Sequence, residues 1–234
     1  MNTKRIDRRR TYLIMCDTET ANTLLDADGN LDTSSTLVYD CGWQVIDKHG
    51  NVYEKRSFVN SDIFYHEAEL MKSAYYAHKI PEYLEGIRKG ERKVATFYEI
   101  RRQMLEDIKK YEINIFCAHN SRFDYNALNT TERWTTKSKY RYFLPYGIEV
   151  WDTLKMARDV VAKKPTYIKF CEDNNYLTKN GKVRLTAEIL YRYISRNNEF
   201  IEEHKGIEDV EIETQILAYC FRQHKAMRKR LWEN

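Results

Sequence analysis

The sequence contains few residues that interrupt regular structure, and it has no long apolar run. Only 8 of its 234 residues are Gly and 3 are Pro, whereas 42% are hydrophobic and 13% are aromatic. This composition excludes disordered, collagen-like and low-complexity chains and predicts a folded protein with a sizeable core. The longest apolar run is six residues, at 216–221, far below the roughly 20 that cross a bilayer. We therefore expect no membrane span.

Closely spaced cysteines are also missing. The five cysteines, at positions 16, 41, 117, 171 and 220, are at least 25 residues apart along the chain. This spacing excludes a CxxC zinc site and a disulfide framework, and it predicts reduced thiols in the cytoplasm. Residues 1–10 are basic and lead directly into a strand-like segment, without the apolar region of a secretory signal.

Positive charge is concentrated at the two ends. Residues 1–10 and 222–234 each carry a net charge of +4, and the residues between them carry −4. This distribution suits a protein that contacts a polyanion at its edges while its interior carboxylates bind cations. Two solvated tails are the alternative interpretation. We expect a basic tail at 1–10 and a single domain over 11–234.

The hydrophobic pattern predicts a mixed α/β sheet flanked by helices. Five segments have the pattern of strands, the second and third forming a hairpin: 11–16, 37–45, 52–59, 113–118 and 148–151. Apolar residues at helical spacing predict three longer helices, over 97–111, over 165–175 and from about 209 onward. A Thr96–Glu99 capping box precedes the first of them.

Several enzyme signatures are absent, among them the GxxxxGK phosphate loop, GxGxxG, GxSxG and HExxH. What remains is a set of carboxylates at strand ends and helix starts. Asp17 and Glu19 follow the first buried strand. Because residues i and i+2 of an extended chain point the same way, both carboxylates can bind one cation. The same D-x-E spacing recurs at Asp209 and Glu211, so a pair of solvated acids is the alternative.

Two later segments add polar residues next to buried elements. Asp124 begins a helix after the strand 113–118, and Asp209 begins the last helix; an N-cap or first-turn role is the alternative for each. Asn120 is equally suited to a turn. His204 lies on a glycine-containing loop, where an accessible imidazole can act as a general base. A surface histidine is the alternative there.

Together these segments supply four carboxylates, Asp17, Glu19, Asp124 and Asp209, and one histidine. Four acids cannot converge without cations, because their repulsion would raise their pKa values or push them apart. Oxygen ligands without thiolates favour Mg²⁺ or Mn²⁺ over Zn²⁺. We predict two such ions per site, an arrangement suited to in-line phosphoryl displacement, in which one ion activates the attacking water and both stabilise developing charge.

Three local sequences, taken in order, resemble a known family. DTE at 17–19, HNxxFDxxxL at 119–128 and HxxxxD at 204–209 are similar to the three motifs of the DnaQ-like (DEDDh) 3′ to 5′ exonucleases. The resemblance extends from residue 13 to about residue 221. It implies an RNase H-like fold with a mixed five-stranded sheet flanked by helices. It also implies a metal-dependent enzyme that hydrolyses phosphodiester bonds at 3′ ends.

The resemblance gives individual residues a role. It implies that Asp17, Glu19 and Asp209 bind the catalytic metals, that Asp124 completes the site directly or through water, and that His204 is the general base. Position 205 is Lys rather than Tyr, which indicates the histidine subclass. The terminal nucleotide would contact the other predicted site residues: Thr18, Thr20, Asn120 and Phe123.

The expected substrate is single-stranded or frayed DNA. The alternatives are an RNA-trimming exonuclease of the same superfamily, a polymerase proofreading subunit, and a silent nucleic-acid-binding module, the last disfavoured because all five polar positions are intact. The basic segment near 228–230 ends the chain, so we do not expect a stable polymerase partner. Short chains rich in Tyr and Asn resemble bacteriophage members of the family, which implies the host cytoplasm.

Three further features have expected roles. The loop 21–36 contains DADGN but lacks calcium-loop spacing, so we expect a solvated turn near the site. Asp152 ends a strand and is expected to cap the next helix through Arg158. Tyr76, Tyr125 and Phe123 are candidate faces for unstacked bases.

Overall fold

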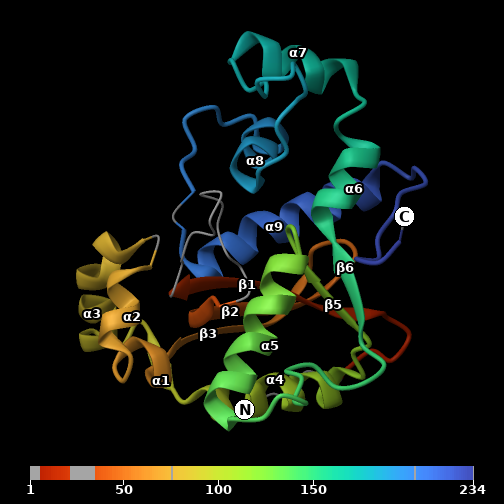
Figure 1. Ribbon diagram of the computed structural model, residues 1–234. Helices are drawn as coiled ribbons and strands as arrows, with labels where there is room; N and C mark the ends of the chain where they lie inside the picture. The colour runs from red at the N-terminus through yellow and green to blue at the C-terminus, as the bar shows by residue number, and fades with distance from the viewer. Residues whose placement is uncertain (1–5, 22–34, 75, 203, 234) are drawn as a thin grey trace.

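A computed structural model (Figure 1) describes residues 6–21, 35–74, 76–202 and 204–233. Its sheet has six strands in the order β4-β3-β2-β1-β5-β6. The pairs β1–β2 and β2–β3 are antiparallel, whereas β3–β4, β1–β5 and β5–β6 are parallel. The strands are β1 (Tyr12–Ala21), β2 (Leu37–Asp47), β3 (Val52–Asn60), β4 (Lys93–Ala95), β5 (Ile115–Ala118) and β6 (Glu149–Asp152).

The five predicted strands are all present, and the mixed α/β class is confirmed. The sixth strand, β4, was not predicted. It spans three residues at the edge of the sheet, and none of them is fully buried, so it has no hydrophobic pattern that could be recognised in the sequence. The predicted hairpin of β2 and β3 turns at Gly50. The φ of this residue, 82°, lies in the left-handed region that favours glycine.

The helices in the described part of the chain follow the predictions in part. They are α1 (Ser61–Phe64), α2 (Ala68–Lys72), α3 (Ile80–Arg88), α4 (Phe97–Tyr111), α5 (Arg122–Thr136), α6 (Thr153–Val160), α7 (Pro165–Asp173), α8 (Ala187–Ser195) and α9 (Gly206–Arg222). The capping box of α4 is formed by Thr96 and Glu99 as predicted. The last helix begins at Gly206, three residues earlier than expected.

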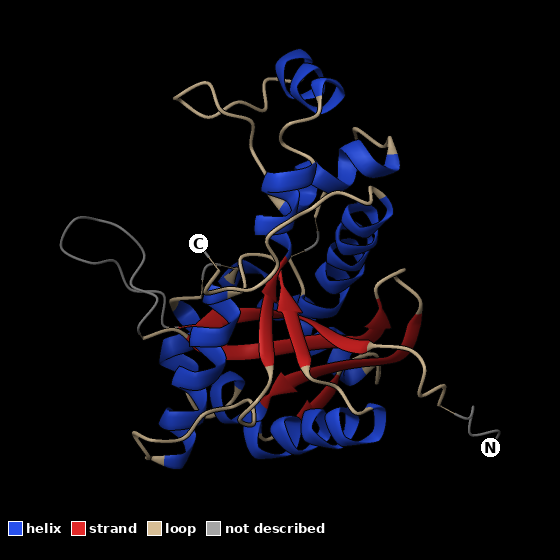
Figure 2. Ribbon diagram, turned by 90° about the vertical axis from the view of Figure 1, so that its right-hand side faces the viewer, coloured by secondary structure: helices blue, strands red, loops and turns tan. Residues whose placement is uncertain are grey.

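Helices cover both faces of the sheet (Figures 1 and 2). Residues of β1 alternate between two separate cores: Ile14 and Cys16 pack with α4 and α5, whereas Leu13 and Met15 pack with α6, α8 and α9. The β1 side chains that face α9 therefore have odd numbers. This alternation continues to the end of the strand and decides where its two acids point.

The segments outside the two layers extend the molecule in two directions. Helices α1 to α3 form a smaller core with the ends of β2 and β3. Helix α7 lies beyond α6 and α8, on the side away from the sheet (Figure 1). Among the described residues, no helix combines the length and apolarity needed to span a bilayer.

The basic C-terminal segment packs against the protein, so the alternative of a solvated tail is wrong for it. The Leu231 N–H donates to the Val150 carbonyl (2.8 Å), which extends the sheet edge past β6. Arg228 pairs with Asp159 at 2.9 Å and Arg230 with Glu149 at 2.8 Å. The charges of Arg228 and Arg230, which were expected to contact a polyanion, are instead neutralised within the fold.

Candidate active site

The end of β1 presents acids on one face and a threonine on the other. Asp17 and Glu19 continue the odd-numbered series that faces α9, and Glu19 is only 9% exposed. Thr18 faces α5, where its N–H and hydroxyl both donate to Asp124 Oδ1 at 3.1 and 2.9 Å. The predicted common orientation of Asp17 and Glu19 thus follows from strand geometry.

Helix α9 reaches this strand end because a glycine leaves room for it. Gly42 pairs with Asp17 across β1 and β2, and a Cβ at Gly42 would lie 2.4 Å from the Ile207 nitrogen. Any larger residue would push the start of α9 outward. The close approach places Asp209, in the first turn of α9, beside the acids of β1.

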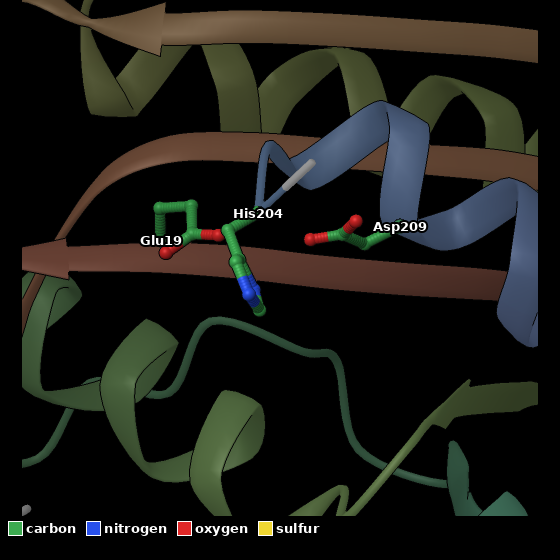
Figure 3. Close-up of side chains that lie close together, drawn as sticks. All are labelled: Glu19, His204 and Asp209. Carbon is green, nitrogen blue, oxygen red and sulfur yellow. The ribbon is translucent and has the colours of Figure 1, made fainter. Parts of the chain in front are cut away.

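Three predicted residues form one cluster (Figure 3). Glu19, His204 and Asp209 each place one potential ligand atom within 4.8 Å of the other two. Asp209 also accepts a hydrogen bond from the Lys205 N–H (3.0 Å), so the first-turn role weighed for it is real and coexists with its place in the cluster. The acid pair 209 and 211 behaves differently from 17 and 19, because i and i+2 diverge on a helix: Glu211 is half exposed and pairs with Lys55.

Asp124 does not cap its own helix. The N-cap of α5 is Ser121, and Asp124 is a 2% exposed first-turn residue whose carboxylate is oriented by Thr18. Burial raises the pKa of Asp124 to about 7, although the hydrogen bonds from Thr18 lower it. The carboxyl is therefore held toward the end of β1 and costs energy to ionise there.

All five predicted catalytic residues line one cleft of about 1340 Å³, although Asp17 and Asp124 lie outside the trio of Figure 3. The predicted nucleotide-contacting residues also line it: Thr18, Thr20, Asn120 and Phe123. Tyr76 lines the cleft and stacks on His204, with ring centroids 4.4 Å apart. Tyr125 instead packs edge-on against Trp232 and does not line the cleft.

The cleft acids are destabilised as anions. Burial, followed by the charges of Glu213 and Asp124, raises the pKa of Asp17 well above its usual range. Burial, followed by Glu202, raises the pKa of Asp209 to about 8. Lys79 acts in the opposite direction on Asp209. Protein groups alone therefore compensate the ionised form of these acids only in part.

His204 has the properties of a base at neutral pH. Burial, followed by the positive charge of Lys79, lowers its pKa below the usual value, so the imidazole is neutral and can accept a proton. Its side chain remains 34% exposed, and Nδ1 lies 3.9 Å from a Glu202 oxygen. Stacking on Tyr76 limits the orientations of the ring.

The cleft contains two acids that sequence reasoning missed, Glu202 and Glu213. Glu213 is 3% exposed, and its Oε2 has no hydrogen-bond partner in the described part of the chain. One signal was available for it. Glu213 follows Asp209 by four residues, which places both on one helix face, and it stands among the apolar residues that predicted the inward side of α9. Glu202 carries no comparable signal.

Asp152 holds the loop between β5 and α5. Asp152 caps α6 by accepting from the Leu154 N–H, as expected, and it also accepts from the Asn120 N–H at 3.0 Å. The predicted involvement of Arg158 is wrong, since Arg158 lines the cleft and makes no ion pair with Asp152 among the described residues.

The predicted turn at 21–36 lies mostly outside the described residues, which omit 22–34.

Comparison of the sequence with protein-family models and with curated proteins finds no match. Solved structures are similar in fold. The nuclease domain of 3′hExo, a DEDDh family member, bound to rAMP, is 11% identical with a TM-score of 0.56, covering 95% of this chain and 98% of that one. A 3′-exonuclease in a structure of 3′-end specific recognition of histone mRNA stem-loop is 12% identical with a TM-score of 0.57, covering 94% and 85%.

A third similar structure is E. coli Exonuclease I in complex with a dA16 oligonucleotide, at 13% identity and a TM-score of 0.53. The match covers 92% of this chain but only 44% of that larger one. At such low identities the likeness concerns the fold, and the chain has the RNase H-like fold of these exonucleases.

Proposed function

We propose that the protein is a DnaQ-like (DEDDh) exonuclease that hydrolyses phosphodiester bonds from the 3′ ends of nucleic acid strands, most readily single-stranded or frayed DNA. The observation that carries the proposal is the trio Glu19, His204 and Asp209, within 4.8 Å of one another in a cleft that Asp17 and Asp124 also line. The fold shared with known 3′-exonucleases supports it. We take 11–234 as the catalytic domain.

The donor set fits divalent cations. The predicted ligands Asp17, Glu19, Asp124 and Asp209 are all carboxylates, and burial raises the pKa of each, which is the state expected of acids that lack their counter-ions. Oxygen donors favour Mg²⁺ or Mn²⁺, and four carboxylates suffice for two ions. Such ions, when bound, neutralise these acids and act as Lewis acids in phosphoryl transfer.

The chain's own groups supply proton transfer and positioning. The neutral imidazole of His204 accepts the proton of the attacking water, and Nε2 is the nitrogen assigned this role because Nδ1 faces Glu202. The N–H and the hydroxyl of Thr18 both donate to Asp124 and so orient that carboxylate. Thr20, Asn120 and Phe123 are then the residues proposed to contact the terminal nucleotide.

The proposal is tested with 5′-labelled strands. The full chain is incubated with matched single- and double-stranded DNA and RNA, in Mg²⁺, in Mn²⁺ or in chelator. We expect a ladder that shortens from the 3′ end, is abolished by chelator, and is strongest on single-stranded DNA. A stronger ladder on RNA identifies the exoribonuclease alternative, and no cleavage under any condition refutes the enzyme.

The five cysteines are free and buried, which supports the expected cytoplasmic location.

A further inference from the structure

The cleft extends well past the acids, and its opposite side is basic. Five cations line this part of it, and we call them the basic wall: Arg158 in α6, Lys163 between α6 and α7, and Lys179, Lys182 and Arg184 after α7. The acids come from the ends of β1, α5 and α9. One cavity therefore has an acidic end and a basic end.

Most cations of the basic wall have no acid partner. Lys163 lies 3.7 Å from Asp159, but Arg158, Lys179, Lys182 and Arg184 form no ion pair in the part of the chain that the structure describes. Cations elsewhere are commonly neutralised, as Arg228 is by Asp159. Unpaired cations gathered in one cavity create a positive potential that attracts phosphate groups.

Three of the five wall residues, Lys179, Lys182 and Arg184, lie on or beside a short hairpin with fixed ends. Leu177 and Val183 form an antiparallel bridge, and the turn between them contains Gly181 at a φ of 71°. This turn places Lys179 and Lys182 on an exposed tip. The base of the hairpin is held where the Tyr167 hydroxyl donates to the Arg184 carbonyl at 2.6 Å.

The hairpin is also connected to the candidate active site. The Nε2 atom of His119 lies 2.8 Å from the Leu185 carbonyl oxygen, and its Nδ1 lies 2.9 Å from the Thr153 hydroxyl. Burial lowers the pKa of His119, so the ring is neutral, as one donor and one acceptor require. His119 thus fixes the basic wall relative to the Asn120 loop.

The cleft is larger than a small-molecule ligand requires. Its volume of about 1340 Å³ exceeds the roughly 300–1,000 Å³ of pockets that hold small molecules. A single terminal nucleotide at the acids would leave the basic end empty. The strand that precedes this nucleotide carries one negative charge per phosphate, and it matches the unpaired cations.

We propose that the basic wall binds the phosphates that precede the 3′-terminal nucleotide, so that the protein acts on polynucleotide strands in preference to dinucleotides. This inference rests on the proposed exonuclease function for its kinetic consequence, whereas strand binding by the wall can be measured without catalysis. The wall acts on substrate affinity and takes no part in bond cleavage.

The test compares two triple variants of the full chain. The first, R158A/K179A/K182A, removes three unpaired cations of the wall. The second, K48A/K109A/K225A, removes the same charge from exposed lysines that do not line the cleft. Binding of a fluorescent oligothymidylate longer than the cleft is followed by anisotropy in chelator over a range of salt, and kcat and KM are measured with Mg²⁺ on this strand and on a dinucleotide.

For the wall variant we expect affinity for the long strand to fall about 100-fold at ~0.1 M salt, with the salt slope reduced by about 2, since each lost phosphate contact removes about 0.7. KM on the long strand should rise, with kcat and dinucleotide cleavage unchanged within about 3-fold. The control should resemble the wild type. Equal losses in both variants, or an unchanged salt slope, would overturn the proposal.

The two proposals fail in different ways. If the wild type binds strands through the wall but cuts nothing, the exonuclease assignment fails and the wall remains. If the wild type cuts long strands and the wall variant cuts and binds them equally well, the wall fails and the exonuclease remains. A dinucleotide preference in the wild type also overturns the wall.

Discussion

Two groups of buried carboxylates in this molecule differ in what surrounds them. Asp107 is 1% exposed and accepts hydrogen bonds from Trp43 Nε1 (3.0 Å) and from the Arg56 guanidinium (3.1 and 3.2 Å). Glu213 is similarly buried, yet one of its oxygens has no partner among the described residues. Protein donors therefore satisfy both oxygens of Asp107, whereas they leave one oxygen of Glu213 without a partner.

Asp47 and Asp209 show the same contrast in their pKa values. They are 3% and 5% exposed. Burial opposes ionisation of Asp47, but hydrogen bonds from Asn51, Tyr53 and the His49 N–H lower its pKa to about 2. Burial and Glu202 raise the pKa of Asp209 to about 8. Burial alone therefore does not identify a functional acid; the absence of compensating donors and cations does.

The largest expected effect comes from replacing one acid in each group with asparagine. Asp17→Asn should lower Mg²⁺-dependent exonuclease turnover by at least ~10³-fold, because it removes a proposed metal ligand, while the fold is retained. Asp107→Asn should instead destabilise the protein by about 3 kcal/mol, because it breaks a buried pair, with activity per folded molecule unchanged. Denaturant titration and initial rates measure both. Undiminished activity in Asp17→Asn would place the site elsewhere.

His204 separates proton transfer from metal binding. His204→Ala should reduce kcat by about 10²-fold, the size of a typical general-base contribution, with a much smaller change in the Mg²⁺ concentration that gives half-maximal rate. Rates over a Mg²⁺ titration give both quantities. Losses of equal size in turnover and in metal affinity would show that His204 is a ligand, as its place in the trio with Glu19 and Asp209 also permits.

The pH dependence of stability should distinguish the two groups. Asp124 and Asp209 have pKa values of about 7 and about 8 in the folded state, above the ~4 of an unfolded chain. Between pH ~4 and ~8 the folded, metal-free protein therefore binds more protons than the unfolded chain. Its free energy of unfolding consequently falls as the pH rises over this range.

Asp47 has the opposite shift, and its stabilisation is complete above ~4, so it does not offset this fall. Thermal unfolding in chelator should therefore show a Tm several degrees lower near pH 8.5 than near pH 5.5. Added Mg²⁺ should reduce the difference by binding the deprotonated acids. A Tm that rises over this range in chelator would contradict the assignment of the raised pKa values.

The smallest expected effect is at Glu213. Glu213→Gln removes an incompletely partnered buried carboxyl and should stabilise the metal-free protein by roughly 1 kcal/mol near pH 8. Chemical unfolding in chelator measures the change, with Gln44→Glu, a buried site facing α9 through Thr214, as the reverse substitution expected to destabilise. Destabilisation by Glu213→Gln would mean that Glu213 has protein partners it needs.

Much of this molecule could be predicted from local sequence. The five longer strands and the capped helix α4 depend on patterns within a few residues, and these predictions were confirmed. The acidic motifs are equally local, and their catalytic role stays a prediction. The orientation of Asp17 and Glu19 follows from strand geometry alone. The chemistry of the donors, all oxygen with one histidine, predicts Mg²⁺ or Mn²⁺, and this choice of ion stays a prediction.

Only the tertiary structure decided which groups meet. The approach of α9 over Gly42, the location of Glu202 and Glu213 in the cleft, the pairing of Arg228 and Arg230 with acids, and the basic wall all depend on contacts between segments far apart in sequence. A residue's type fixes its charge and its donors. Whether that charge is neutralised depends on neighbours that the chain brings together only when it folds, because the interactions are set by distance in space.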